Sequence, residues 1–151
     1  MVGILNPIIA ARIYTALDTQ FSVEQQREFI RTFPQRGIFL VAVDTSSNRV
    51  VGLQDVTPFG EFTPAFDHVG VVGTFVDLNR RREGIASRLF AATFDVAPKK
   101  GYEKFFTYVR ADNTAALQTY LRQGFRVVGT AARHAKIDGR YVDEVMIEKF
   151  L

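Results

Sequence analysis

The sequence contains no cysteine among its 151 residues. This absence excludes disulfide bonds, metal sites built from thiolates and a cysteine nucleophile. The chain also has no apolar run close to the roughly 18 residues that a membrane-spanning helix needs. Its start, Met1–Pro7, lacks both the basic segment and the long apolar segment of a signal peptide. We therefore expect a cytoplasmic protein that has no membrane partner.

Linkers and repeats are also missing. No segment is rich in glycine, serine and proline, no repeat recurs with a period of roughly 20 to 50 residues, and no tract has low complexity. A length of 151 residues is typical of one domain around one core. We therefore expect a single domain over residues 1–151. No cluster of side chains has the spacing of metal ligands, so we expect no metal.

The excess of positive charge is small, with a net charge of +3 and a pI near 9.4. A basic surface can favour nucleic acid, an anionic membrane or a phosphorylated cofactor. Nucleic-acid binding would require basic residues interleaved with stacking aromatic residues across one face. The sequence offers one dense cluster, Arg80–Arg82, so we expect no nucleic-acid partner.

Hydrophobic spacing and turn residues predict the element order α-α-β-β-β-α-β-α-β-β. Apolar residues at helical spacing cover Pro7–Leu17. Ser22 and Gln25 form a capping box that opens a helix ending near Phe33. An Asp138-Gly139 pair predicts a hairpin turn. The other predicted elements are strands at residues 38–43, 50–56, 69–76, 104–109, 125–137 and 140–150 and helices at residues 85–96 and 114–122. This order predicts an α/β (α+β) fold with a mixed sheet.

The arginine cluster lies in a loop between a strand that ends at Val76 and a helix that begins near Ile85. The first turn of a helix has N–H groups without intrahelical partners, and its dipole attracts anions. Gly84 has no Cβ and Ala86 is small, so a phosphate can approach the backbone. The loop is neither a Walker loop nor a dinucleotide fingerprint. It predicts an anion site, and a basic surface loop before an ordinary helix is the alternative.

Two segments resemble one known family. Arg81–Ala86, with the pattern Arg-x-x-Gly-x-Ala, resembles the Arg/Gln-x-x-Gly-x-Gly/Ala motif of the GNAT superfamily of acyl-CoA-dependent N-acyltransferases. Asn113–Phe125, which contains Asn-Thr-Ala-Ala, Tyr120 and a final Gly-Phe pair, resembles the second conserved segment of that family. The resemblance covers about residues 38 to 151. It implies a single-domain GNAT fold, in which helices flank a largely antiparallel central sheet with a V-shaped splay between its two middle strands.

The resemblance also implies acetyl-CoA as co-substrate. The end of the splayed strand is expected to bond the pantetheine arm and the acetyl carbonyl, and the amides from Arg82 to Ser87 are expected to hold the pyrophosphate. Asn113 is expected to bond the pantetheine arm, to cap the next helix, or both. Gly73 suits either a β-bulge or close packing. The expected cofactor-binding residues are Phe75, Val76, Asp77, Leu78, Arg81, Arg82, Glu83, Gly84, Ile85, Ala86, Ser87 and Asn113.

Tyr120 is the general acid that the resemblance implies. A phenol stays protonated at pH 7 and can protonate the departing coenzyme A thiolate; a core tyrosine is the alternative. The general base is open, because Tyr108 stands where some family members carry a glutamate. His68, with Glu61 and Asp67 nearby, is the remaining side-chain candidate, and a surface histidine and catalysis through ordered water are its alternatives.

The acceptor is implied only by class. Phe59, Phe62 and Phe66 lie in a loop expected near the amine entrance, where they can wall a pocket or fold into a local core. Residues 134–146 resemble the phosphinothricin and amino-acid acetyltransferase branch, in which the last strands often form dimers. The resemblance thus implies transfer of acetyl to the primary amine of a small molecule by direct attack in a ternary complex, with a homodimer as an option. A protein N-terminal or ribosomal-protein acetyltransferase and a non-catalytic acyl-CoA sensor are the alternatives.

Overall fold

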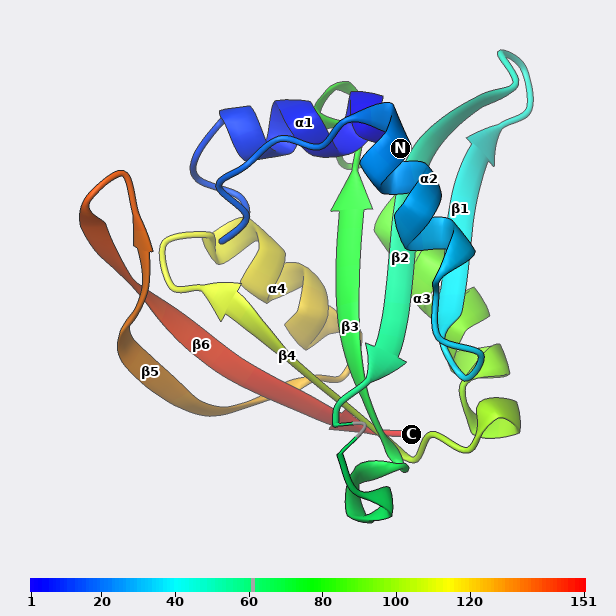
Figure 1. Cartoon of the computed structure of the whole chain (residues 1–151), viewed down its shortest axis with the longest axis vertical. Coiled ribbons are helices and arrows are strands. Elements are labelled where there is room, and N and C mark those ends of the chain that lie inside the picture. Colours follow the sequence, from blue (N-terminus) through cyan, green and yellow to red (C-terminus); the bar gives the residue numbers. More distant parts are fainter. Residues whose placement is uncertain (61) are drawn as a thin grey trace.

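The computed structural model describes residues 1–60 and 62–151, and its strands form one sheet with the order β1-β2-β3-β4-β6-β5 (Figure 1). The strands are β1 (Ile38–Asp44), β2 (Arg49–Pro58), β3 (Val69–Val76), β4 (Lys104–Arg110), β5 (Arg126–Ile137) and β6 (Arg140–Phe150), the helices are α1 (Val2–Ala10), α2 (Val23–Arg31), α3 (Ile85–Val96) and α4 (Thr114–Arg122), and the 3-10 turns are η1 (Pro64–Phe66), η2 (Leu78–Arg80) and η3 (Pro98–Lys100). All neighbouring strands are antiparallel except β3 and β4. The predicted α/β (α+β) class and element order are confirmed.

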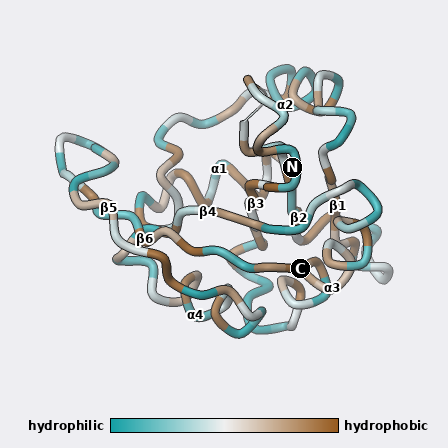
Figure 2. The backbone as a smooth tube through the Cα atoms, turned by 90° about the horizontal axis from the view of Figure 1, so that it is seen from below, coloured by the Kyte–Doolittle hydropathy of each residue, from teal (hydrophilic) through white to brown (hydrophobic). Residues whose placement is uncertain are grey.

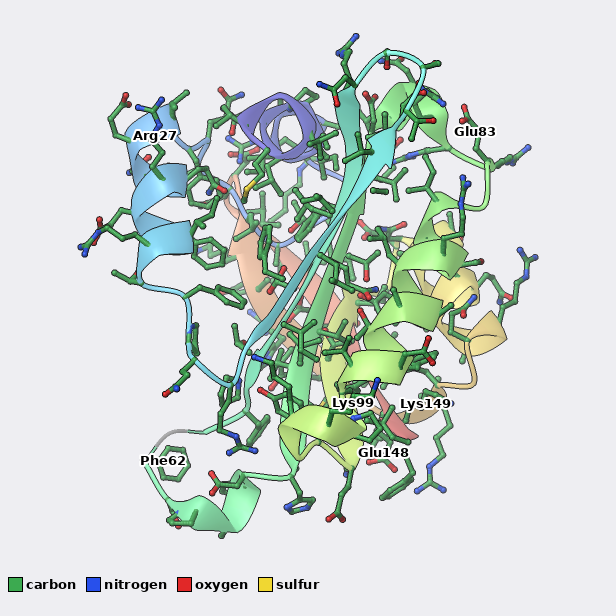
Figure 3. All side chains as sticks on the ribbon, turned by 90° about the vertical axis from the view of Figure 1, so that its right-hand side faces the viewer. Arg27, Phe62, Glu83, Lys99, Glu148 and Lys149 are labelled. Atoms are coloured by element: carbon green, nitrogen blue, oxygen red, sulfur yellow. The ribbon has the colours of Figure 1, made fainter. Side chains whose placement is uncertain are left out.

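Helices cover the sheet from both sides. In Figure 3 the sheet is seen nearly edge-on, with α1 and α2 on one side and α3 and α4 on the other. The larger core lies under α3 and α4, where Phe90, Phe105 and Ile147 are fully buried. Figure 2 shows hydrophobic residues concentrated in the central strands, while the tip of the β5–β6 hairpin is largely hydrophilic. An apolar layer therefore lies on each face of the sheet.

The first helix differs from its prediction. It covers Val2–Ala10, not Pro7–Leu17, and Pro7 lies inside it. Ile4, Leu5, Ile8 and Ile9 are buried against the sheet, so the packed face begins before the proline. The left-handed Arg12, with φ of 59°, then turns the chain away from helical geometry. Residues 11–22 form a connecting segment instead of a helical turn.

The sheet splays where the resemblance predicts it. β3 and β4 pair only over Val69–Val71, opposite Lys104–Phe106. Beyond that point Val72–Val76 continues upward beside β2, while β4 leans away toward β6 (Figure 1). In the part of the chain that the structure describes, no strand pairs with the β4-facing edge of this half of β3. The backbone groups along that edge are consequently available to a ligand that enters the slot.

Local signals explain the remaining boundaries. Ser22 and Gln25 form both hydrogen bonds of the capping box at the start of α2. Gly124, with φ of +85°, follows the end of α4 in the left-handed conformation. Asp138 and Gly139 both have positive φ, as a two-residue hairpin turn requires.

Candidate active site

The loop before α3 has the features of an anion site. Gly84 precedes the helix in the left-handed conformation, with φ of 74°, and no side chain caps the first turn. The first turn also carries no acidic residue. A Cβ on Gly84 would meet nothing within 4 Å, so the space above the loop is open. The amides of Ile85, Ala86 and Ser87 therefore lack an intrahelical partner and face an approachable surface, which fits a pyrophosphate.

The three arginines of the cluster have different roles. Arg80 makes ion pairs at 2.8 Å with both Asp44 and Glu83. Its hydrogen bonds hold the pKa of each carboxyl below the usual range. Arg80 thus ties the loop to the end of β1. Arg81, in contrast, lies over the ring of Tyr14, with the guanidinium carbon 3.9 Å from the ring centroid. Arg81 and Arg82 remain on the groove side of the loop.

A groove of about 840 Å³ runs from this loop to the splay. Its lining includes most of the expected cofactor-binding residues, namely Phe75, Val76, Arg81, Arg82, Gly84, Ile85, Ala86, Ser87 and Asn113. Three expected residues lie outside it for local reasons. Asp77 donates its amide to Val51 and accepts at its side chain from Asn79. Leu78 packs on the α1 cluster, and Glu83 pairs with Arg80.

Asn113 is the N-cap of α4. Its Oδ1 accepts from the Ala116 amide at 3.2 Å, and its Nδ2 donates to the Tyr14 carbonyl at 3.0 Å. The capping prediction is confirmed. Asn113 therefore fixes the connecting segment of residues 11–22 against the start of α4, at the wall of the groove.

Tyr120 lies at the deep end of the groove. Its ring packs edge-on against Phe90 and Phe125, with centroids 5.2 and 5.1 Å away. Its hydroxyl donates to Thr74 Oγ1 at 3.3 Å. Tyr120 consequently combines a core position with a polar tip that points at the splayed part of β3.

A chain of buried polar groups supports that tip. Gln54 Nε2 donates to Thr74 Oγ1 at 2.7 Å, and Gln54 Oε1 accepts from the hydroxyl of Thr93 on α3. Gln54 and Thr93 are both fully buried. Thr74 is thus held from β2 while it contacts Tyr120. These hydrogen bonds fix the position of the Tyr120 phenol relative to β3, along which the co-substrate is expected to lie.

The environment of Tyr120 keeps it protonated. Burial raises the pKa of Tyr120 to about 12; the hydrogen bond to Thr74 lowers it, and the charge of Asp55 raises it slightly further. A thiolate in the same dry surroundings is destabilised as well, so its tendency to take a proton rises in parallel. The phenol can therefore act as a proton donor throughout the neutral pH range.

A second pocket, of about 630 Å³, opens on the α1 and α2 side of the sheet. We call it the acceptor pocket. It meets the groove at six residues that line both cavities: Tyr14, Thr74, Phe75, Asn113, Ala116 and Tyr120. Two cavities that enter from opposite faces thus converge on the Tyr120 hydroxyl and Thr74. This arrangement can bring two substrates together at one point.

Asp55 is a site residue that the sequence analysis missed. It lies on β2, lines the acceptor pocket and is partly buried. Burial raises its pKa to about 6. Among the described residues no cationic side chain pairs with it. A carboxylate with a pKa near neutrality in a pocket is suited to general-base catalysis. The signal in the sequence was a charged residue within the predicted strand 50–56, where Asp55 follows Gln54.

Gly73 makes the position of Asp55 possible. Gly73 pairs with Asp55 in an unbroken register between β2 and β3, so the β-bulge considered for Gly73 is wrong and close packing is confirmed. A Cβ on Gly73 would lie 2.9 Å from Asp55 Oδ1. The missing side chain leaves room for the carboxylate to enter the acceptor pocket.

His68 is not brought to this site. It is exposed and lies at the opposite end of β3 from Thr74, about 20 Å away along an extended strand. Its carbonyl accepts from the amides of Glu103 and Lys104, and its side chain lines neither cavity. Asp67 lies beside it, and Glu61 falls outside the described residues. The structure therefore gives His68 no route to the Tyr120 hydroxyl.

The loop phenylalanines are also remote. Phe59 contacts Phe66 and Phe106 edge-on, at 5.2 and 5.6 Å between centroids, and Phe62 contacts Phe66 at 5.8 Å. Figure 3 labels Phe62 and Glu83 at opposite ends of the molecule. The three side chains contact one another but stay exposed, Phe62 to 81%, so they form no buried core, and they do not line the acceptor pocket.

Two further features bear on the kind of site. Within residues 1–60 and 62–151 no group of three histidine, aspartate or glutamate side chains is arranged to hold a metal ion. In the same part of the chain no helix has the length and hydropathy needed to cross a bilayer.

Comparisons with known proteins agree with this geometry. The family model described as acetyltransferase (GNAT) family matches residues 10–125. YwnH of Bacillus subtilis (strain 168), named as a phosphinothricin acetyltransferase, is 25% identical over 143 residues, which cover 95% of this chain and 86% of that protein. The chain belongs to the acetyltransferase (GNAT) family, and it is an acyltransferase.

Solved structures share the fold. A ribosomal-protein-alanine N-acetyltransferase from Brucella melitensis has a TM-score of 0.91 at 24% identity, covering 99% of this chain and 91% of that one. A phosphinothricin acetyltransferase from Sinorhizobium meliloti, solved in complex with AcCoA, has a TM-score of 0.88 at 16% identity, covering 98% and 80%. At these identities the likeness concerns the fold alone.

Proposed function

We propose that the protein transfers an acetyl group from acetyl-CoA to the primary amine of a small molecule by direct attack in a ternary complex. The observation that carries the proposal is the meeting of the groove and the acceptor pocket at Tyr120 and Thr74. Holding two reactants at one point supplies a large part of the catalysis of a bimolecular step.

In this proposal the groove binds acetyl-CoA. The pyrophosphate lies on the amides of Ile85, Ala86 and Ser87, and Arg81 and Arg82 add positive charge at the rim. The pantetheine arm follows the unpaired edge of β3 toward Thr74. A backbone amide near Val76 then polarises the thioester carbonyl. The relative from Sinorhizobium meliloti, which binds AcCoA, supports the choice of donor.

We assign Asp55 as the general base and Tyr120 as the general acid. The amine nitrogen attacks the thioester carbon, and Asp55 takes one proton from the nitrogen. As the C–S bond breaks, its electron pair goes to sulfur, which takes the proton of Tyr120. Tyr120 regains a proton from solvent, and Asp55 releases its own. The balance is one amine and one thioester giving one amide and one thiol.

A negative charge placed on the first turn of α3, where the pyrophosphate is proposed to bind, tests the binding of acetyl-CoA. Ser87 is exposed on the first turn of α3. Ser87→Glu adds a negative charge where the helix dipole favours one, so folding is retained. The same charge opposes the pyrophosphate, and we expect acetyl-CoA affinity to fall at least tenfold by calorimetry. Ser87→Gln, which is neutral and of equal size, is the matched control and keeps the affinity within about threefold of wild type.

Release of free thiol in the presence of an amine panel tests turnover. We expect acetyl-CoA to raise the melting temperature by mass action and at least one primary amine to accelerate thiol release. Binding of acetyl-CoA without amine-dependent release would refute the transferase proposal and leave a sensor. Absence of both effects at millimolar acetyl-CoA would refute the assignment of the groove.

A further inference from the structure

The side chains that line the acceptor pocket include two carboxylates and one guanidinium. Its ionised side chains are Asp55, Glu144 and Arg110. Asp55 has no cationic partner among the described residues. Glu144 is opposite Arg110 in the pairing of β4 with β6 and lies 3.9 Å from His134 Nε2. The charge that a ligand meets in this pocket therefore depends on whether Arg110 is free.

Arg110 is already fully engaged by the protein. It is only 6% exposed. Its Nε and Nη2 donate to the two carboxylate oxygens of Asp112 at 2.9 and 2.7 Å. Its Nη1 donates to the carbonyls of Arg12 and Thr15 at 2.7 and 3.3 Å. Arg110 thus fastens the connecting segment of residues 11–22 to the end of β4, and its charge is neutralised by Asp112.

Among the described residues that line the pocket, a carboxylate on the ligand would find no cationic side chain that is free of a protein partner. Burying an ionised carboxylate without a cation to pair with it is costly. Asp55, close to the point where the amine must react, would add repulsion. An ammonium group, in contrast, is favoured by the negative charge of Asp55. The pocket therefore selects for an amine and against a carboxylate next to it.

Much of the remaining lining is apolar, beside the polar side chains of Gln25, Gln26 and Thr107, and the pocket is large enough for a ring. Phe29 and Phe39 contact each other edge-on at 6.2 Å between centroids and form one wall. Phe29 and Leu17 remain 39% and 38% exposed at a cavity of about 630 Å³, so both can contact a ligand. Further apolar lining includes Leu5, Phe21, Leu53 and Val71.

We infer that the acceptor is a primary monoamine carried on an apolar body of about the size of an aromatic ring, without a carboxylate beside the amine. The inference rests on the proposed function and deepens it. It differs from the amino-acid acceptors that the resemblance of residues 134–146 implies. The amine end meets Asp55 and Tyr120, and the apolar body packs between Phe29 and Leu17.

Pairs of compounds that differ by one carboxylate test the inference. The pairs are phenethylamine with L-phenylalanine, tryptamine with L-tryptophan, and isoamylamine with L-leucine, at saturating acetyl-CoA. L-Phenylalaninamide keeps the volume and removes the charge. We expect kcat/KM, expressed per concentration of neutral amine, to be at least tenfold higher for each monoamine, with the amide close to the monoamine. Equal or higher values for the amino acids would overturn the inference.

Variants at Phe29 and Leu17 test where the apolar part of the acceptor binds. Phe29→Ala should lower kcat/KM for phenethylamine at least fivefold more than it lowers kcat/KM for ethylamine, which has no ring to contact this wall. Leu17→Arg adds a cation at the mouth of the pocket. It should therefore reduce the ratio of kcat/KM for phenethylamine to kcat/KM for L-phenylalanine. Melting temperatures with acetyl-CoA report folding and donor binding in each variant. If acetyl-CoA binds and only amino acids react, the inference alone fails; if no amine reacts, the proposed function fails with it.

Discussion

Asp55 on β2 faces Gly73 on β3, and a Cβ on Gly73 would stand 2.9 Å from the carboxylate oxygen of Asp55. The carboxylate lies partly buried in the acceptor pocket, where its pKa is about 6. One strand thus supplies the candidate base, and its neighbour supplies the space for it. Four predictions rest on this pair, and a fifth rests on the polar chain behind Tyr120.

Asp55→Asn removes the proposed base with almost no change in volume. General-base catalysis is typically worth about 10²- to 10⁴-fold, so we expect kcat to fall by at least about 100-fold. Affinity for acetyl-CoA should stay within about threefold, because Asp55 lies outside the groove lining. Thiol release measures the first quantity and calorimetry the second. An Asn variant with normal turnover would assign the base role to ordered water.

The pH dependence of kcat/KM also tests the proposed role of Asp55 as the general base. The active form of Asp55 is the carboxylate, so wild-type kcat/KM, expressed per concentration of neutral amine, should fall as the pH drops below about 6. Tyr120, with a pKa of about 12, should cause no loss at any pH below about 11. The Asn variant should lose the acidic limb. A profile that breaks near pH 4 in the wild type would contradict the buried carboxylate.

Stability should depend on pH through the same group. The folded pKa of Asp55, about 6, lies above the ordinary aspartate value of 3.8, so the folded state binds more protons than the unfolded state between these values. Stability from this group is therefore present below about pH 4 and is lost as the pH rises to about 6. We expect Asp55→Asn to be more stable than wild type at pH 7 by about 1 to 3 kcal/mol in urea unfolding. At pH 4 the two proteins should be nearly equal.

Gly73→Ala places a methyl group against the carboxylate. Besides Asp55, the added Cβ would lie 3.3 Å from Phe75 Cε2. We expect a loss of about 1 to 3 kcal/mol of stability and a fall in kcat larger than the fall in acetyl-CoA affinity. Gly3→Ala is the control, because a Cβ there meets nothing within 4 Å and the position lies in α1. That change should be neutral or stabilising.

The sequence predicted those parts of the fold that depend on local signals. The β-branched run of β3, the glycine before α3, and the Asn113 cap with Gly124 at the end of α4 gave the boundaries of the strand and both helices that surround the groove. The start of α1 could not be predicted in this way. The position of α1 depends on the burial of its apolar face against Leu53. No residue near the start of α1 indicates this long-range contact in the sequence.

Most residues that line the groove were also accessible from the sequence, because the motif and the strand before it are contiguous. The acceptor side was not. Asp55 reaches the site through its pairing with Gly73 across two strands, and sequence spacing does not show such pairing. His68 lies close to the motif strand in the sequence, yet an extended strand carries it to the far end of the sheet.

The polar chain from Thr93 through Gln54 and Thr74 to Tyr120 gives the last prediction. Tyr120→Phe should lower kcat at least about 100-fold with little change in acetyl-CoA affinity, because only the proton donor is lost. Gln54→Leu removes the support of Thr74 and leaves buried hydroxyls unpaired, at a cost of about 1 to 3 kcal/mol in stability. It should also lower kcat by misplacing the phenol. If Gln54 acts through Tyr120, the two losses in kcat should not add in the double variant, whereas independent, additive effects would show that Gln54 has a structural role alone.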